Sequence, residues 1–141
     1  MLSQVATLCA GLAISLAPGS KQATERQMKV QLNKFESAIV ARTNAERARY
    51  GLRPLVVDRW LVQSARRHAT WMTTRHTLQH TSAPVAENIA MGQASSAQAV
   101  QDWMNSSGHR ANILNPSYRR IGAAAYTAPN GTTFWCQQFL W

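Results

Sequence analysis

The sequence predicts an α+β fold, in which helices come first and a small antiparallel sheet closes the chain. Two observations support this class. Through most of the chain, apolar residues recur at intervals of three and four, which is the period of amphipathic helices. From Arg120 onward the pattern becomes strand-like, with a turn signal between two segments. A chain of 141 residues is long enough for one core and too short for two ordinary domains.

The first predicted helix runs from Ala23 to about Tyr50. Thr24 is placed to cap its start and Gly51 to end it. The next residues, 51–54, form a turn, because a proline disfavours helix at the residue before it. The apolar face of this helix consists of Met28, Leu32, Phe35, Ile39 and Thr43.

The second predicted helix starts after Asp58, a good N-cap residue, and runs to about Thr74. Its inner face has helical spacing and includes a histidine. We therefore expect His68 to be a hydrogen-bonded core residue and not a ligand. The inner face is Leu61, Ala65, His68 and Met72.

Residues 75–95 are rich in Thr, Ser, Ala, Pro, Gly and Gln and are predicted to form a long loop. Long loops in compact domains are often functional, and this one contains His76, His80 and Glu87. His76 could lie beside His80 and contact it without binding a ligand itself. The segment Glu87–Met91 could add a third strand to the sheet.

The third predicted helix is capped by Ser95 or Ser96 and is stopped by the polar residues 105–108. One more helical turn is expected at His109–Leu114. The buried side of the third helix is Ala99, Val100, Trp103 and Met104.

Two antiparallel strands are predicted at Arg120–Tyr126 and Thr132–Leu140, because the turn residues 129–131, Pro-Asn-Gly, lie between them. Four tryptophans are most simply explained as core residues, whereas the burial of the terminal Trp141 is open. The four are Trp60, Trp71, Trp103 and Trp135.

Residues 1–20 contain no charged side chain and include a small-residue apolar run at 5–17. This run has the length of a signal peptide and is too short to span a bilayer comfortably. We expect residues 1–20 to be a signal peptide and residues 21–32 a helical extension, followed by one domain at 33–141. The mature protein should then be secreted or held in the cell envelope without a stable transmembrane helix. A retained membrane anchor is the alternative.

The chain has two cysteines, Cys9 and Cys136. If the signal peptide is removed, Cys136 is alone and no disulfide can form within the monomer. The simplest interpretation of Cys136 is a small buried hydrophobic residue.

The net charge is +9, and twelve of the fifteen basic residues are arginine. Arginine binds carboxylate and phosphate bidentately, so anionic polymers and acidic surfaces are candidate partners. A solvated surface that keeps the protein soluble explains the same charge. Nucleic acid is an unlikely partner, because no binding motif is present and the aromatic residues do not alternate with the arginine pairs.

Two histidines and one glutamate, His80, Glu87 and His109, lie in polar, turn-forming sequence and are candidates to converge on one site. Two imidazoles and a carboxylate can bind a divalent metal such as zinc, or act as acid and base without one. The structural alternative is that Glu87 fixes both histidines and ties the loop to the helix. Asn88 and Asn112 are candidates to bridge loop amides.

The order of these motifs resembles the CAP superfamily of cysteine-rich secretory, antigen 5 and pathogenesis-related proteins. The similarity is greatest to its bacterial branch of small secreted SCP-domain proteins. It covers roughly residues 33–141 and implies a three-layer α–β–α sandwich. The matching motifs and positions are NAER at 44–47, GLRPL at 51–55, Ala65, His68, Ala69, Met72, His80, ENIA at 87–90, Trp103, SGHRANIL at 107–114 and WCQQF at 135–139.

The resemblance also implies a cleft with two histidines and two glutamates. His80, Glu87 and His109 match three of these positions, and Ser106 stands where the second glutamate is expected. Asp102 cannot easily replace it, because a helix turns about 100° per residue and directs Asp102 elsewhere.

Our leading hypothesis is a secreted CAP protein whose cleft contains His80, Glu87, Asn88, Ser106 and His109. The resemblance implies a lipid-like ligand or a cell-surface contact, and the excess of arginine favours an anionic component. A divalent metal is a candidate cofactor because of the two imidazoles and the carboxylate. Catalysis is not expected, since the missing carboxylate weakens any acid/base pair. One alternative is a metal-dependent hydrolase of peptide or ester bonds that uses both histidines and Glu87. Another is a structural or interaction module.

Overall fold

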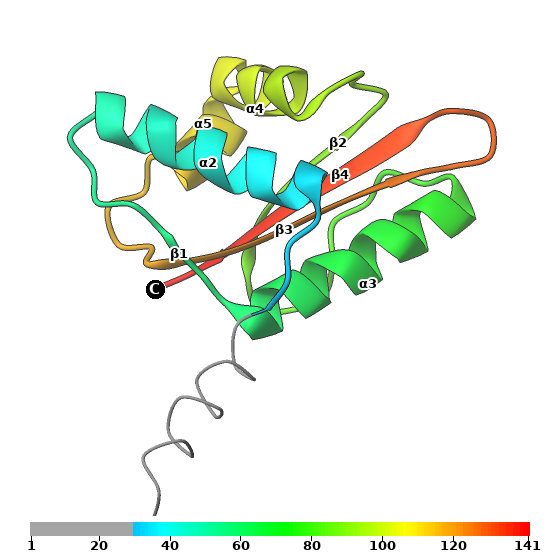
Figure 1. Cartoon of the computed structure of the whole chain (residues 1–141), viewed down its shortest axis with the longest axis horizontal. Helices are drawn as coiled ribbons and strands as arrows, with labels where there is room; N and C mark the ends of the chain where they lie inside the picture. Colours follow the sequence, from blue (N-terminus) through cyan, green and yellow to red (C-terminus); the bar gives the residue numbers. More distant parts are fainter. Residues whose placement is uncertain (1–29) are drawn as a thin grey trace, which may run out of the picture.

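The computed structural model describes residues 30–141, which form a sheet between two layers of helices. Helix α3 covers one face of the sheet, and helices α2, α4 and α5 cover the other (Figure 1). This is the predicted three-layer α–β–α arrangement. The elements are α2 Lys34–Arg49, β1 Val56–Val57, α3 Arg59–Arg75, β2 Ala86–Met91, α4 Ser96–Asn105, α5 Ser107–Ile113, β3 Arg120–Thr127 and β4 Thr133–Leu140.

Helix α2 begins at Lys34, later than predicted. Asn33 is its N-cap and accepts hydrogen bonds from the amides of Phe35 and Glu36, while the Glu36 side chain accepts one from the Asn33 amide. This reciprocal capping box fixes the point at which the helix begins, and residues 30–33 are not helical. The prediction of helix at 30–33 was therefore wrong, and the predicted start at Ala23 lies outside the described residues.

The buried side of α2 differs in part from the predicted apolar face. Ile39 and Thr43 are buried as expected, whereas Phe35 is exposed. Two charged residues, Glu36 and Arg47, are buried instead. Glu36 pairs with Arg66, and Arg47 donates to the carbonyls of Ile113 and Asn115. Because these partners lie far away in the sequence, helical periodicity gave no sign of them.

Helix α3 follows the prediction closely. Asp58 caps it by accepting a hydrogen bond from the Leu61 amide at 2.9 Å. The helix approaches β3 at Gly122, where a Cβ atom would lie 2.2 Å from the backbone carbon of Leu61 and 2.4 Å from the backbone nitrogen of Val62. A residue without a side chain is therefore required for this packing.

The sheet has the strand order β1-β3-β4-β2. Strands β3 and β4 form the predicted antiparallel hairpin, and Gly131 in the turn has φ +86°. Strand β2 adds the third antiparallel strand beside β4. The two-residue strand β1, which the sequence did not predict, pairs in parallel with β3.

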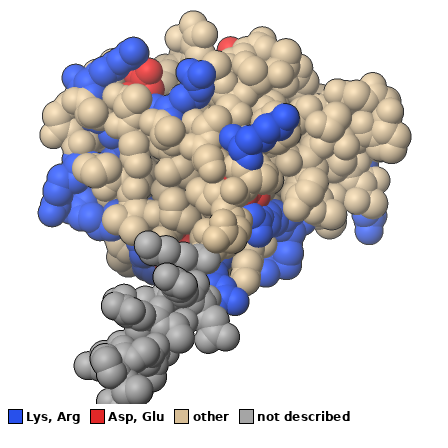
Figure 2. Space-filling model, in the orientation of Figure 1, with Lys and Arg blue, Asp and Glu red and all other residues tan. Residues whose placement is uncertain are grey.

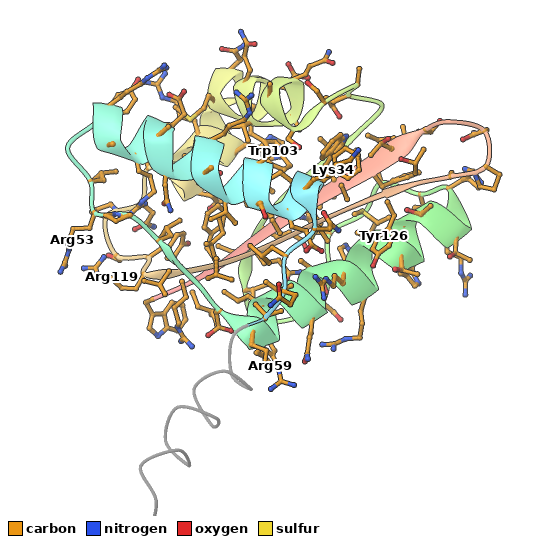
Figure 3. All side chains as sticks on the ribbon, in the orientation of Figure 1. Lys34, Arg53, Arg59, Trp103, Arg119 and Tyr126 are labelled. Carbon is orange, nitrogen blue, oxygen red and sulfur yellow. The ribbon has the colours of Figure 1, made fainter. Side chains whose placement is uncertain are left out.

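The core contains two of the four tryptophans predicted there. Trp103 and Trp135 are buried, and the Trp103 indole between α4 and the sheet donates a hydrogen bond to the Ile89 carbonyl at 3.1 Å (Figure 3). Trp60 and Trp71 are 47% and 38% exposed, so the prediction was wrong for both. Both lie on α3, where only one side of the helix faces the sheet. Trp141 is exposed.

No helix within residues 30–141 is long and apolar enough to cross a membrane. The predicted signal peptide lies outside these residues, as do positions 21–29 of the predicted extension.

Candidate functional site

The Glu87 carboxylate is the centre of the candidate site. Glu87 is buried on β2. Its Oε1 accepts hydrogen bonds from His80 Nδ1 and from the Thr81 amide, both at 2.9 Å. Its Oε2 accepts hydrogen bonds from Gln138 Nε2 at 2.8 Å and from the Cys136 thiol at 3.5 Å. Each oxygen thus has two donors, which satisfies the hydrogen-bonding capacity of a buried carboxylate.

Strand pairing explains two of these contacts. Glu87 on β2 lies directly opposite Gln138 on β4, and directly opposed residues of an antiparallel pair project their side chains to the same face. Cys136, two positions along β4, projects to that face as well. Burial, followed by the nearby charge and hydrogen bond of Glu87, raises the pKa of Cys136 well above its usual value. The thiol therefore stays protonated and donates, as expected for a buried structural cysteine.

His80 is held in one tautomer by Glu87. A carboxylate oxygen only accepts, so Nδ1 of His80 carries the proton that it donates. In the neutral ring, Nε2 then carries the free lone pair. The His80 side chain is 60% exposed, so this nitrogen is available to a ligand. Carboxylates orient metal-binding histidines in the same way.

His68 belongs to the site, although the sequence placed it in the core. Its Nε2 donates to the Gln79 carbonyl at 2.7 Å and lies 3.7 Å from Glu87 Oε1. Its ring stacks on Trp71, with 5.8 Å between the ring centroids and 8° between the planes. The apolar stripe of α3 concealed this role, because the stripe packs on β3 and β4 and so predicted only a core position for His68. The one local signal for this role was the polar loop that begins at His76, because Gln79 in that loop accepts the hydrogen bond from His68.

His109 enters the site from α5 and is joined to β2 through asparagines. Asn88 Nδ2 donates to the His109 carbonyl at 3.1 Å. Asn112 Nδ2 donates to the Glu87 carbonyl at 3.2 Å and to Asn88 Oδ1 at 2.9 Å. Asn88 and Asn112 therefore bridge backbone groups, as expected, and tie α5 to the edge of the sheet.

The fold shifts the pKa of His109. Burial, and then the charge of His80, lowers the pKa of His109 below its usual value. His109 is thus kept neutral to a lower pH. His76 lies elsewhere: it ends α3 in a left-handed conformation, and its ring packs against Phe134 at 6.4 Å.

Ser106 forms the joint between α4 and α5, and it is half-buried. Its side chain makes no capping hydrogen bond to α5. Asp102 does not replace the missing carboxylate, because it accepts a hydrogen bond from Gln93 on the exposed surface at 3.0 Å.

The fit of the site to a metal depends on its free donors. Within residues 30–141, no three His, Cys, Asp or Glu side chains are grouped to hold a metal ion. Glu87 already has four donors, so it is placed to orient His80. Nε2 of His80 and the ring of His109 are the donors that suit zinc. Two imidazoles, with water completing the coordination, make a weak site.

Two adjoining pockets open beside His68 and Trp71. One, of about 410 Å³, is lined by His68, Trp71, Gln79, His80, Thr81 and Ser82. The other, of about 370 Å³, shares His68, Trp71, Thr81 and Ser82 and adds Ser64, Arg67 and Ala83. Together they form a groove whose lining is polar apart from the indole and one alanine. We call it the Trp71 groove.

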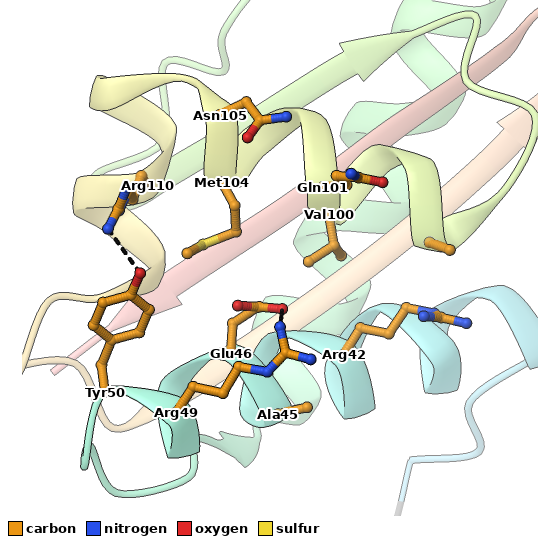
Figure 4. A pocket seen from close by; sticks show the side chains of 11 residues that line it. Arg42, Ala45, Glu46, Arg49, Tyr50, Val100, Gln101, Met104, Asn105 and Arg110 are labelled. Atoms are coloured by element: carbon orange, nitrogen blue, oxygen red, sulfur yellow. Dashed lines mark hydrogen bonds and ion pairs between the residues drawn. The ribbon is translucent and has the colours of Figure 1, made fainter.

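A separate pocket of about 450 Å³ lies between α2 and the α4–α5 corner (Figure 4). Val100 and Met104 line it from α4. At its rim, Arg49 pairs with Glu46 at 2.9 Å, and Arg110 donates to the Tyr50 hydroxyl at 2.7 Å. Arg42 also lines this pocket, which we call the interhelix pocket.

Residues 40–139 match the model of the CAP family, described as the cysteine-rich secretory protein family. The Bacillus subtilis protein YkwD is 33% identical over 141 residues, covering 88% of this chain and 54% of YkwD. The secreted protein RBT4 of Candida albicans is 30% identical over 96 residues, covering 68% of this chain and 27% of RBT4. The chain thus spans about half of YkwD and about a quarter of RBT4.

Solved structures show the same fold. An extracellular protein with an SCP domain from Bacillus anthracis has a TM-score of 0.69 and 26% identity, covering 91% of this chain and 45% of that protein. An outer surface protein of Borrelia burgdorferi has a TM-score of 0.70 and 18% identity, covering 79% of this chain and 95% of the Borrelia protein. The second similarity concerns the fold alone. Sequence and fold agree, and this chain belongs to the CAP family, the cysteine-rich secretory protein family.

Proposed function

We propose that this protein is an extracellular binding protein whose His80–His109 cleft holds a component of a cell surface and does not turn it over. Similar proteins support the location, since RBT4 is described as secreted and the Bacillus anthracis protein as extracellular. The predicted signal peptide at residues 1–20 agrees with this proposal.

The hydrogen-bond saturation of Glu87 is the observation that supports binding over catalysis. A general base needs a free lone pair aimed at the substrate. Glu87 offers none, because its oxygens accept from His80, Thr81, Gln138 and Cys136. Cys136 is no nucleophile either, since its buried thiol stays protonated. His80 Nε2 keeps a free lone pair, but the metal-dependent hydrolase also requires Glu87 to act directly, so it is the less favoured alternative.

The chemistry of the cleft favours a polar or anionic ligand there. The Trp71 groove is lined mainly by hydroxyl, amide and imidazole groups. The chain carries a net charge of +9, and on the face seen in Figure 2 the Lys and Arg side chains lie at several separate places. Such a surface attracts an extended anionic polymer. An anionic cell-surface component is thus the ligand that we propose for the cleft.

Co-sedimentation with purified bacterial cell walls tests the proposal. The secreted protein should bind, and His80→Ala and His109→Ala should each weaken binding several-fold. His76→Asn is the matched control, because it removes a histidine outside the cleft and asparagine tolerates the left-handed conformation at this position. Equal binding by all four proteins would contradict the cleft as the binding site. Turnover of peptides or esters that depends on His80 would instead favour the hydrolase.

A lipid-like ligand is a second candidate, and the interhelix pocket is the observation that favours it. Val100 and Met104 offer apolar surface there, and the arginines at the rim could pair with an acidic headgroup. Binding of a fluorescent fatty acid tests this function. Met104→Glu should weaken fatty-acid binding, while His80→Ala should leave it unchanged. The reverse pattern would contradict this second function.

A further inference from the structure

Trp71 offers an aromatic surface at the edge of the cleft. Its side chain is 38% exposed on α3. The His68 ring lies stacked against it, nearly parallel, and the hydrogen bond from His68 to the Gln79 carbonyl fixes that ring. The two rings therefore form a rigid platform that needs no rearrangement to receive a flat partner.

The groove around this platform is polar. Ser64, Gln79, Thr81 and Ser82 line it together with the exposed ring of His80. Each of the two adjoining volumes, about 410 Å³ and about 370 Å³, falls in the range of small-ligand sites. An extended chain with repeated polar groups fits such a groove better than a compact apolar molecule.

A sugar ring has the chemistry that this lining would recognise. One face of a pyranose is made of C–H groups, which carry partial positive charge and stack on the electron-rich face of an indole. The rim of the ring carries hydroxyls, which pair with hydroxyl, amide and imidazole side chains. Trp71 would supply the stacking surface, and the side chains around it the hydrogen bonds.

Arg67 adds a preference for an acidic sugar. It is exposed, lines the second half of the groove and forms no ion pair with any other residue in 30–141. A guanidinium group binds carboxylate bidentately. No carboxylate lines the groove to compete with a ligand, since Glu87 is buried and fully hydrogen-bonded.

We propose that the Trp71 groove binds an acidic oligosaccharide, with one sugar ring stacked on Trp71 and a carboxylate paired with Arg67. This inference rests on the proposed function and names the chemical class of its ligand. It also gives Trp71 a role that its exposed position on α3 otherwise lacks.

Isothermal titration with a hexamer of galacturonic acid tests the inference on the whole secreted protein. The hexamer should bind, and Trp71→Ala should weaken binding about tenfold, the size expected for one aromatic contact. Trp71→Phe should retain much of the affinity. Trp60→Ala is the matched control, since Trp60 is 47% exposed on the same helix and lines neither half of the groove. Melting curves establish that each variant is folded.

Two further ligands separate stacking from charge. Neutral maltohexaose should bind more weakly than the uronate, and Arg67→Gln should remove most of that difference. Polyglutamate matches the charge without sugar rings and should show no dependence on Trp71. The inference is overturned if Trp71→Ala and Trp60→Ala bind the hexamer equally, or if polyglutamate binds as tightly as the uronate.

The outcomes also separate this inference from the proposed function. If cell walls bind in a His80-dependent manner and the hexamer does not bind, the sugar proposal fails while the binding cleft stands. If neither binds, both proposals fail.

Discussion

The Glu87 carboxylate stabilises the site because both of its oxygens are fully hydrogen-bonded. Four donors, two from the loop before β2 and two from β4, converge on its two oxygens. Replacing Glu87 by glutamine keeps the shape of the side chain but replaces one oxygen, an acceptor, by an NH₂ group. This new donor would face the donor groups that bond Glu87 in the wild type. We expect Glu87→Gln to lower the free energy of unfolding by about 1–3 kcal/mol, the cost of unsatisfied buried groups. Urea denaturation measures this.

Asp102→Asn is the control for this prediction, because its carboxylate accepts one hydrogen bond on the exposed surface. Its effect should stay within about 0.5 kcal/mol. Equal effects of the two substitutions would mean that the Glu87 network adds little to stability.

His109 makes stability depend on pH. Its pKa is lowered in the fold by burial and by the charge of His80, so the unfolded chain binds the proton more readily. The contribution of His109 to stability should therefore fall as pH decreases below about 6.5 and level off below its folded pKa. His109→Gln removes this term. The stability difference between wild type and variant should favour wild type more at pH 7.5 than at pH 5.5, as measured by urea denaturation. Parallel pH profiles would contradict this assignment.

The sequence indicated the site residues unevenly. The family motifs pointed to His80, Glu87 and His109. The structure joins His80 directly to Glu87, and it joins the backbone of His109 to β2 through Asn88. Local patterns did not reveal His68 as a site residue, because it belongs to an apolar stripe. They did not reveal Gln138 either, because it lies 51 positions from Glu87 in the sequence. Such contacts depend on strand register and on helix packing, which no local pattern contains.

At the level of elements, the contact between α3 and β3 depends on Gly122. An added methyl group would collide with the backbone of Leu61 and Val62, and backbone yields less easily than a side chain. We expect Gly122→Ala to destabilise the fold by about 1–3 kcal/mol or more, as overpacking does. Gly108→Ala, in α5 with open space around the new methyl group, should be neutral or stabilising. Thermal unfolding compares the two, and equal losses would contradict the close approach.

Arg47 ties α2 to the segment before β3. Its buried guanidinium donates to the carbonyls of Arg53, Ile113 and Asn115 at 2.8–2.9 Å. Burial, and then the charge of Arg119, lowers its pKa. A lysine cannot reach all these acceptors, so Arg47→Lys should cost about 2–3 kcal/mol of unfolding free energy.

Arg49→Lys is the matched control on the same helix, since Arg49 forms an exposed pair with Glu46 and such pairs contribute about 0–1 kcal/mol. Urea denaturation of both lysine variants tests whether the buried guanidinium of Arg47 stabilises the fold; equal losses of unfolding free energy would contradict this.

Local signals predicted most elements. The Asp58 cap placed α3, and the Pro-Asn-Gly turn placed the hairpin. The start of α2 was predicted too early because apolar residues continue at helical spacing upstream of Lys34. The stronger signal was the capping box of Asn33 and Glu36. Strand β1, with two residues, is too short to have a period.

At the scale of the whole molecule, the residues of the candidate site come from different layers of the fold. His80 comes from the loop after α3, Glu87 from the edge strand and His109 from the helix on the other face. Periodicity predicted an α+β chain, and the family resemblance supplied the three layers. The resemblance also supplied the prediction that the side chains of His80 and His109 share one cleft, although these residues lie 29 positions apart.

Metal binding should therefore stabilise the assembled fold. If zinc binds His80 and His109 with a Kd of about 10 µM, 0.1 mM free zinc stabilises the folded state by about 1.4 kcal/mol. The melting temperature should rise by a few degrees at pH 7.5 and by less at pH 5.5, because protonated imidazole does not bind metal. Magnesium should have no effect, since it prefers oxygen ligands. Calorimetric scans with and without each metal measure this.

Variants locate the metal that causes such a shift. His109→Ala should abolish the effect of zinc, and His76→Asn should leave it intact. Ser106→Glu places a carboxylate at the joint between α4 and α5, where the resemblance expects one, and should enlarge the shift. A zinc effect that persists in His109→Ala would locate the metal elsewhere, and Glu87 would then serve to tie the loop to the sheet without holding a metal-binding histidine in place.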